Sequence, residues 1–196
     1  MPITVDHEAR RAALARIAAD IIAAKGIEAA TVRAIAEAAG SSTKVVSHYF
    51  SDKRALLMAT YRSATEDAAA RSQASQPRGQ ADVAAYLLSL LPASPPMVRN
   101  WKVWLAFWAY ATSDVEFAQE QRGQVLNTRA RVEDLLGGDP RVTGLDADAR
   151  ARAARDLLTL VIGVSLQAAF DPEDWAPSRQ YRPIIERIRA LVGHLS

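Results

Sequence analysis

The chain has 196 residues, and 24 Lys and Arg against 22 Asp and Glu give it a formal net charge of +2. That length allows one domain, or one domain and a small second one, with a core that needs no disulfide or metal to hold it. The absence of cysteine excludes disulfides, thiolate nucleophiles and Cys-ligated metal sites, and it fits the reducing cytoplasm, where we expect the protein to act.

Composition also favours helix over strand. Alanine occupies 39 positions, and aromatic residues make up only 7% of the chain. Charged residues interrupt every apolar stretch well before the roughly 20 residues that a membrane span needs, and the chain does not open on a secretion signal. We therefore expect an all-α protein with no membrane partner.

Positive charge is concentrated toward the N-terminus. Residues 1–62 carry nine Lys or Arg and six Asp or Glu, a net charge of +3, whereas the rest of the chain carries 15 and 16, a net charge of −1. An excess of this size occurs on many ordinary surfaces, so it indicates a polyanionic partner such as nucleic acid only weakly.

Glycines and capping residues divide the N-terminal part into four helices. Helical spacing of apolar residues predicts helices over 7–25, 31–40, 42–49 and 52–75. The second is only about two turns long, begins at the N-cap Thr31 and stops at Gly40. Ser42 or Thr43 caps the third.

A polar segment at 72–80 leads into a second group of helices. They are predicted near 81–91, 97–112, 114–136, 146–170 and 180–194, with breaks at 92–96, 137–140 and 171–172. The total is about nine helices.

The second and third helices, joined through a glycine turn, form a helix-turn-helix pattern. In this motif one helix crosses the phosphate backbone and the next lies in the major groove, where all four base pairs can be distinguished. The apolar residues that can pack the two helices together are Val32, Ile35, Ala36, Ala39 and Val46. The opposite face then remains available for DNA.

Candidate DNA contacts lie on that opposite face. Lys44 can donate to guanine, and Thr43 and Ser47 can hydrogen-bond to several bases. Val45 offers methyl groups to thymine, and Arg33 on the preceding helix can reach a guanine edge. The residues placed for phosphates are Thr31, Ser42, His48, Tyr49 and Lys53, together with backbone amides at the helix starts.

Residues 31–57 resemble the TetR family of transcriptional repressors. The segment TVRAIAEAAG follows the family pattern T-x-x-x-I-A-x-x-A-G, and HYF and DKRALL supply the Y-F and K-x-x-L-L elements in register. Two positions depart from the family. Ser41 stands where an apolar residue is usual, so we expect looser packing there, and Ser47 stands where an aromatic residue is frequent, so we expect an altered base preference.

A narrower resemblance, to the BetI-like subgroup, is carried by STKVVSHYF at 42–50 and WLAFWA at 104–109. The resemblance implies a DNA-binding domain over 1–50, and over 51–196 a connecting helix with ligand binding and dimerisation. It also implies a homodimer that binds double-stranded operator DNA and that a small-molecule effector releases.

Three indoles share one face of the helix predicted at 97–112. They are Trp101, Trp104 and Trp108, and Leu105 lies beside them. Such a stripe is usually core, but the resemblance implies a ligand-receiving domain, and indole faces attract quaternary ammonium groups such as that of choline. Core packing and a ligand site for a choline-like effector both remain open.

The last two helices are predicted to form the dimer interface. The segment 157–170 is apolar almost all round, and a second apolar stripe follows in the last helix. Two subunits can cover both helices by pairing them into a four-helix interface, in which we expect Val164 and Ile188.

Two other classes of protein are alternatives to the repressor. The main alternative is an all-helical module that binds protein and not DNA. An enzyme is the more distant one, because His7 and His194 have no sequence neighbours that suggest a triad or a metal site, and His48 suits a phosphate better than catalysis. We expect no catalytic residue, metal or cofactor.

Overall fold

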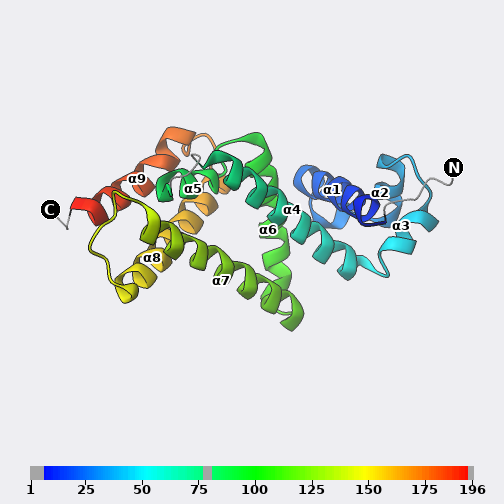
Figure 1. Cartoon of the computed structure of the whole chain (residues 1–196). Coiled ribbons are helices and arrows are strands. Elements are labelled where there is room, and N and C mark those ends of the chain that lie inside the picture. Colours follow the sequence, from blue (N-terminus) through cyan, green and yellow to red (C-terminus); the bar gives the residue numbers. More distant parts are fainter. Residues whose placement is uncertain (1–6, 77–80, 194–196) are drawn as a thin grey trace. The chain divides into compact units, whose positions relative to one another are not determined.

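The computed structural model describes residues 7–76 and 81–193, and within them the chain is helical with no β-strand. The helices are α1 His7–Lys25, α2 Val32–Ala38, α3 Thr43–Tyr49, α4 Lys53–Ser75, α5 Val83–Ser89, α6 Pro95–Ala111, α7 Val115–Gly138, α8 Ala147–Phe170 and α9 Pro177–Gly193, with a 3-10 turn at Ile27–Ala29 (Figure 1). The all-α prediction and the number of helices are confirmed for the described residues.

Side-chain caps begin the two short helices. The Thr31 hydroxyl accepts a hydrogen bond from the Ala34 amide at 3.1 Å, and the Ser42 hydroxyl accepts one from the Val45 amide at 3.3 Å. Ser42, and not Thr43, is therefore the cap of α3. Between the helices Gly40 has a φ of 57°, which an L side chain rarely adopts.

The C-terminal helices differ from the prediction at their ends. Helix α6 begins at Pro95 and α9 at Pro177, both earlier than expected, because proline is tolerated in a first turn, where its missing N–H has no helical partner. Helix α7 continues through both glycines to Gly138. The polar segment at 72–80 belongs to α4 as far as Ser75. Residues 77–80 and His194 lie outside the described part.

The chain packs as two compact units. The N-terminal unit comprises Met1–Asp67 and Arg99–Ala118, and the C-terminal unit comprises Ala68–Val98 and Gln119–Ser196. Helices α4, α6 and α7 therefore contribute residues to both. The functional boundary at residue 50 stays a prediction.

The N-terminal unit contains two apolar clusters. The first joins α1 to α2, α3 and the start of α4, and its fully buried members include Ile35, Val46 and Phe50. Ala36 is buried with them and Val32 and Ala39 pack at its margin, as the sequence predicted. In the second cluster Phe107 of α6 stacks on Tyr61 of α4, with ring centroids 3.8 Å apart.

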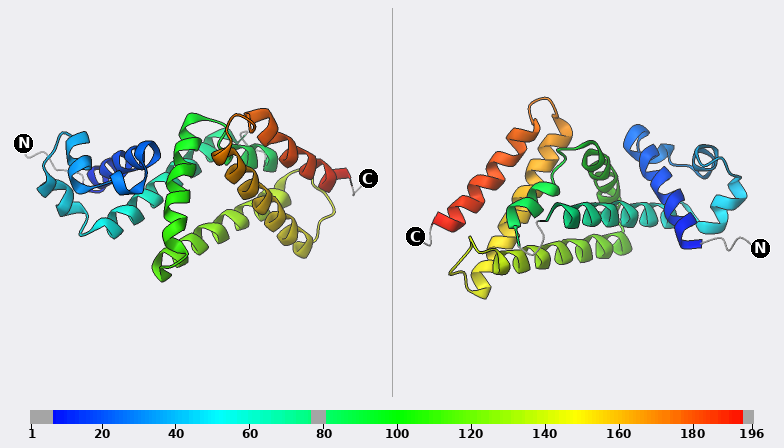
Figure 2. Two further views of the ribbon diagram at one scale, coloured as in Figure 1. Left: turned by 180° about the vertical axis from the view of Figure 1, so that it is seen from behind. Right: turned by 45° about the horizontal axis from the view of Figure 1, so that its top comes forward.

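The C-terminal unit is built around α8. Its core joins α5, α7, α8 and α9, and α8 and α9 lie side by side as a hairpin (Figure 2). Val164 and Ile188 are 5% and 7% exposed within this core. Their placement between subunits was therefore wrong, since residues of their own chain already cover them.

Helix α8 is also the one described helix that is long and apolar enough, by length and composition, to cross a membrane. A core helix passes the same test, and Leu157 and Val161 of α8 are buried in the C-terminal unit. Packing within the C-terminal unit explains the apolar character of the buried face of this helix.

The turn before α3 carries a packing defect that a mutation can remove. The Ser41 hydroxyl is buried without a hydrogen-bond partner. We expect Ser41→Ala to raise the free energy of unfolding by about 1 kcal/mol, because an unsatisfied buried hydroxyl is lost. Ser42→Ala, which removes the α3 cap, should lower it by about 1 kcal/mol. Urea denaturation followed by circular dichroism measures both, and a loss of stability in Ser41→Ala would contradict the assignment.

Candidate nucleic-acid interface

Helix α3 is held by its buried face and exposes the rest. Val46 and the following Phe50 are 0% and 2% exposed and anchor the helix in the first apolar cluster. The exposed residues are Thr43, Lys44, Ser47 and His48, and Val45 and Tyr49 are half-buried. All six sequence-predicted residues of α3 are thus at least partly exposed, on a helix whose position is fixed, and Tyr49 also packs at the margin of the cluster.

The residues predicted beside α3 are exposed as well. Thr31, Arg33 and Ser42 all face solvent. The hydroxyl oxygens of Thr31 and Ser42 accept hydrogen bonds from the helix amides, and a hydroxyl has one proton to donate in addition. Each cap can therefore stabilise its helix and donate to a phosphate oxygen at the same time.

Lys53 is exposed but already has a carboxylate partner. Its Nζ lies 2.6 Å from Oε2 of Glu28, and this pair holds the pKa of Glu28 below its usual range. The Tyr110 hydroxyl lies 3.5 Å from Oε1 of Glu28, a longer contact than that of Lys53. Glu28 therefore competes with a phosphate for Lys53. This pair could not be predicted from the sequence, because 25 residues separate its members.

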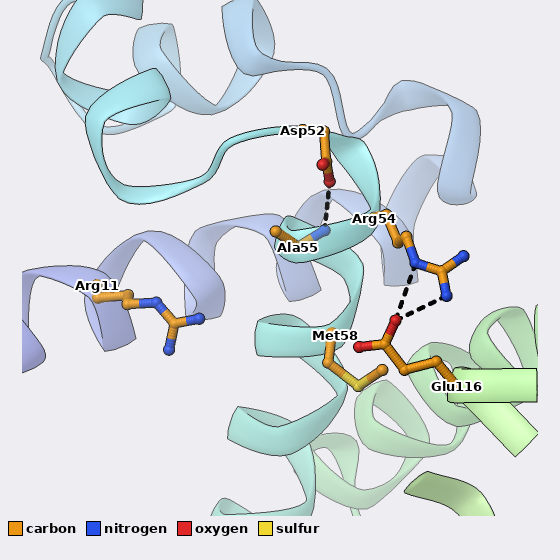
Figure 3. Close-up of a pocket in the computed structure, with 6 residues that line it drawn as sticks. All are labelled: Arg11, Asp52, Arg54, Ala55, Met58 and Glu116. Carbon is orange, nitrogen blue, oxygen red and sulfur yellow. Dashed lines mark hydrogen bonds and ion pairs between the residues drawn. The ribbon is translucent and has the colours of Figure 1, made fainter. Parts of the chain in front are cut away.

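An open pocket lies beside the start of α4. It is lined by Arg11, Asp52, Arg54, Ala55, Met58 and Glu116 (Figure 3). Asp52 accepts a hydrogen bond from the Ala55 amide at 2.7 Å, which lowers the pKa of Asp52 and caps α4. Arg54 binds Glu116 at 2.8 Å. The charged groups of this pocket thus hold helix ends together.

Arg54 also binds Asp114, just before α7. One guanidinium nitrogen lies 2.7 Å from Oδ1 of Asp114, and a second contacts the other oxygen. The two carboxylates raise the pKa of Arg54, and Arg54 lowers that of Asp114. The guanidinium also lies 5.0 Å from the centre of the Phe117 ring. This network was not predicted from the sequence, because it connects residues about 60 positions apart.

The three tryptophans of α6 form an edge-to-face cluster around Trp101. Its ring centroid lies 5.3 Å from that of Trp104 and 5.7 Å from that of Trp108. Trp101 is buried, whereas Trp104, Leu105 and Trp108 are half-buried. Trp104 and Trp108 pack against the second apolar cluster, but the buried Nε1 of Trp104 has no hydrogen-bond partner. The rings therefore contribute to the core, and one polar atom among them stays unsatisfied.

Two family models match the chain. The model for bacterial regulatory proteins of the tetR family covers residues 14–60, and that for the C-terminal part of BetI-type transcriptional repressors covers residues 77–193.

Several characterised proteins are similar over most of their length. The HTH-type transcriptional regulator PksA of Bacillus subtilis is 30% identical, over 97% of this chain and 94% of its own. The HTH-type transcriptional regulator BetI of Burkholderia mallei is 34% identical, over 88% of each chain.

Solved structures have the same fold. A transcriptional regulator from a Rhodococcus species superimposes with a TM-score of 0.80 at 24% identity, covering 94% of this chain and 96% of its own. A regulator from Saccharomonospora viridis, crystallised with choline, gives a TM-score of 0.79 at 19% identity over 93% and 96%.

The Lys53–Glu28 pair provides a test of the interface. We expect Glu28→Gln to strengthen binding to duplex DNA about two- to fivefold, because Lys53 loses a competing carboxylate. Fluorescence anisotropy with a labelled duplex measures the change. Glu186→Gln removes one carboxylate from the C-terminal unit and is the charge-matched control. Equal affinities for the wild type and Glu28→Gln would show that the pair does not compete with DNA.

Proposed function

Since the chain belongs to the TetR family of transcriptional regulators, with a C-terminal part of the BetI type, we propose that it is a homodimeric repressor that a small-molecule effector releases from operator DNA. The observation that carries the proposal is the exposed polar face of α3, which the buried Val46 and Phe50 hold in place. Residues from about 1 to 50 bind DNA, and residues 51–196 transmit, bind the effector and dimerise.

In this proposal α3 enters the major groove. Lys44, Thr43 and Ser47 contact base edges, with Val45 against a thymine methyl and Arg33 beside them from α2. Contacts to the phosphates come from Thr31, Ser42, His48, Tyr49 and Lys53. Because Ser47 is small and exposed, it reads bases by hydrogen bonding and not by apolar contact.

Release requires two conformers with different separations of the two α3 helices. A dimer that fits its operator places them about 34–36 Å apart, one turn of DNA. The effector favours the other conformer, and it can do so only by the difference between its affinities for the two.

We propose the tryptophan cluster of α6 as part of the effector site and a small organic cation of the choline class as the ligand. The support is the BetI-type C-terminal part, the choline in the Saccharomonospora viridis regulator, and the aromatic faces of Trp101, Trp104 and Trp108. Such faces attract quaternary ammonium groups.

Base and phosphate contacts can be separated by mutation. We expect Lys44→Ala and Arg33→Ala to relax base preference, each losing about 1–3 kcal/mol of discrimination at one position. Lys53→Ala should weaken binding to all sequences about equally. It should also reduce by about 0.9 the steepness with which the logarithm of affinity falls against the logarithm of salt concentration, which we call the salt slope. Selection from a randomised duplex library measures base preference, and affinity measured over a range of salt concentrations gives the salt slope. An unchanged preferred sequence and affinity in Lys44→Ala would place α3 outside the groove.

The effector is tested with choline and its neutral isostere 3,3-dimethylbutanol. We expect choline to quench tryptophan fluorescence and weaken DNA binding, with the isostere about tenfold weaker because it lacks the charge. Trp108→Leu should reduce the response to choline while leaving DNA affinity unchanged, and a thermal melt excludes unfolding as the cause. Equal responses to the two compounds, or none, would reject the cationic ligand and leave DNA binding standing.

The proposed dimer can be tested by mutation of the exposed face of α8. Thr159, Gly163, Gln167 and Phe170 share this exposed face, and Phe170 is 76% exposed. A Cβ added at Gly163 meets nothing within 4 Å in its own chain. We expect a wild-type dimer by light scattering, and a monomer after Phe170→Glu with retained helicity, because an unpaired charge would be buried between subunits. A wild-type monomer at micromolar concentration would contradict the two-fold model.

A further inference from the structure

Two histidines and a tyrosine meet where the first residue of α1 lies beside the end of α3. The His7 ring centroid is 6.1 Å from that of His48 and 5.9 Å from that of Tyr49. The Tyr49 hydroxyl lies 3.4 Å from Nδ1 of His7, and the His48 ring stands edge-on to Tyr49 at 5.3 Å. Both imidazoles are exposed.

The core of the N-terminal unit fixes this arrangement. Leu14 and Ala18 of α1 are buried in the same cluster as Val46 and Phe50. One turn after His7, the guanidinium of Arg11 lies 5.5 Å from the centre of the Phe50 ring. The N-terminal end of α1 is therefore held against α3, and its first side chain lies next to the exposed end of the proposed DNA-reading helix.

We propose that His7 belongs to the DNA-contacting surface and that His7 and His48 bind phosphate as a protonated pair, so that the protein takes up protons when it binds DNA. The inference rests on the proposed function. A neutral imidazole donates one N–H and an imidazolium two, and a charge-assisted hydrogen bond to phosphate is the stronger. Imidazole is also the side chain that ordinarily changes charge between about pH 5 and 8.

The surroundings of the pair are mostly cationic. The charged and titratable groups that α1, α3 and the corner before α4 bring to this region are Glu8, Arg10, Arg11, Lys44, Tyr49 and Asp52. Asp52 already accepts a hydrogen bond from the Ala55 amide. A phosphate beside the pair favours the positively charged form of each imidazole. Protonation is thus coupled to DNA.

The sign of the effect follows from linkage. The complex holds more protons than the unbound protein, so affinity rises as pH falls. Each proton taken up contributes up to about tenfold in affinity per pH unit. Each imidazolium on a phosphate also steepens the dependence of affinity on salt by about 0.9. From about pH 8 to pH 6 the salt slope should therefore increase by up to about 1.8.

The experiment measures affinity for a labelled duplex, enriched by selection at neutral pH, as a function of salt at both pH values. It compares the wild type with His7→Gln, His48→Gln and the double variant. The chain has three histidines, so His194→Gln is the matched control. Circular dichroism at each pH establishes that every variant stays folded.

We expect each single variant to lose about half of the pH-dependent increase in salt slope, the double variant to lose nearly all of it, and the control to lose none. A salt slope that does not change with pH in the wild type overturns the inference while leaving DNA binding intact. An equal loss of affinity in His7→Gln at both pH values also overturns it, because it assigns His7 a packing role. Failure to bind any duplex rejects the proposed function itself.

Discussion

One guanidinium links α4 to the start of α7 within the N-terminal unit. Arg54 is the second residue of α4, and it binds Asp114 and Glu116 at the start of α7 while its plane lies over the Phe117 ring. Such forked contacts fix direction as well as distance. Helix α3 is itself held by the buried Val46 and Phe50, and the Arg54 contacts hold the start of α4, which follows α3 after three residues. The stacked rings of Tyr61, Phe107 and Phe117 continue this junction into the core.

The position of α6 follows from the same junction. Its residues from Arg99 onward belong to the N-terminal unit, and Phe107 packs between rings from α4 and α7. In the proposed mechanism, a ligand that displaces this part of α6 also displaces the rings of α4 and α7 that Phe107 contacts, because close-packed side chains transmit a displacement instead of absorbing it. We propose this junction as the route from the effector site to α3.

Local signals determined how much could be predicted from the sequence. The ends of α2 and α3 were found because Thr31, Ser42 and Gly40 act within three or four residues of themselves. The exposed face of α3 followed from the same spacing. Long-range partners left no such signal, so the pairing of Lys53 with Glu28 was missed. Apolar periodicity identified Val164 and Ile188 as covered, but it could not tell a neighbouring helix from a second subunit.

Lys53 and Arg54 are adjacent in the sequence, and their partners give them different roles. Lys53 has one exposed carboxylate partner, whose side chain is 79% exposed, so a phosphate can replace it at little cost. Arg54 has two carboxylates and an aromatic face, and the side chain of Asp114 is only 23% exposed. Breaking these contacts would leave two negative charges without their partner. The start of α4 therefore combines Arg54, whose contacts are fixed, with Lys53, which can exchange its carboxylate partner for a phosphate of DNA. The proposed phosphate contact at Lys53 forms without moving α3.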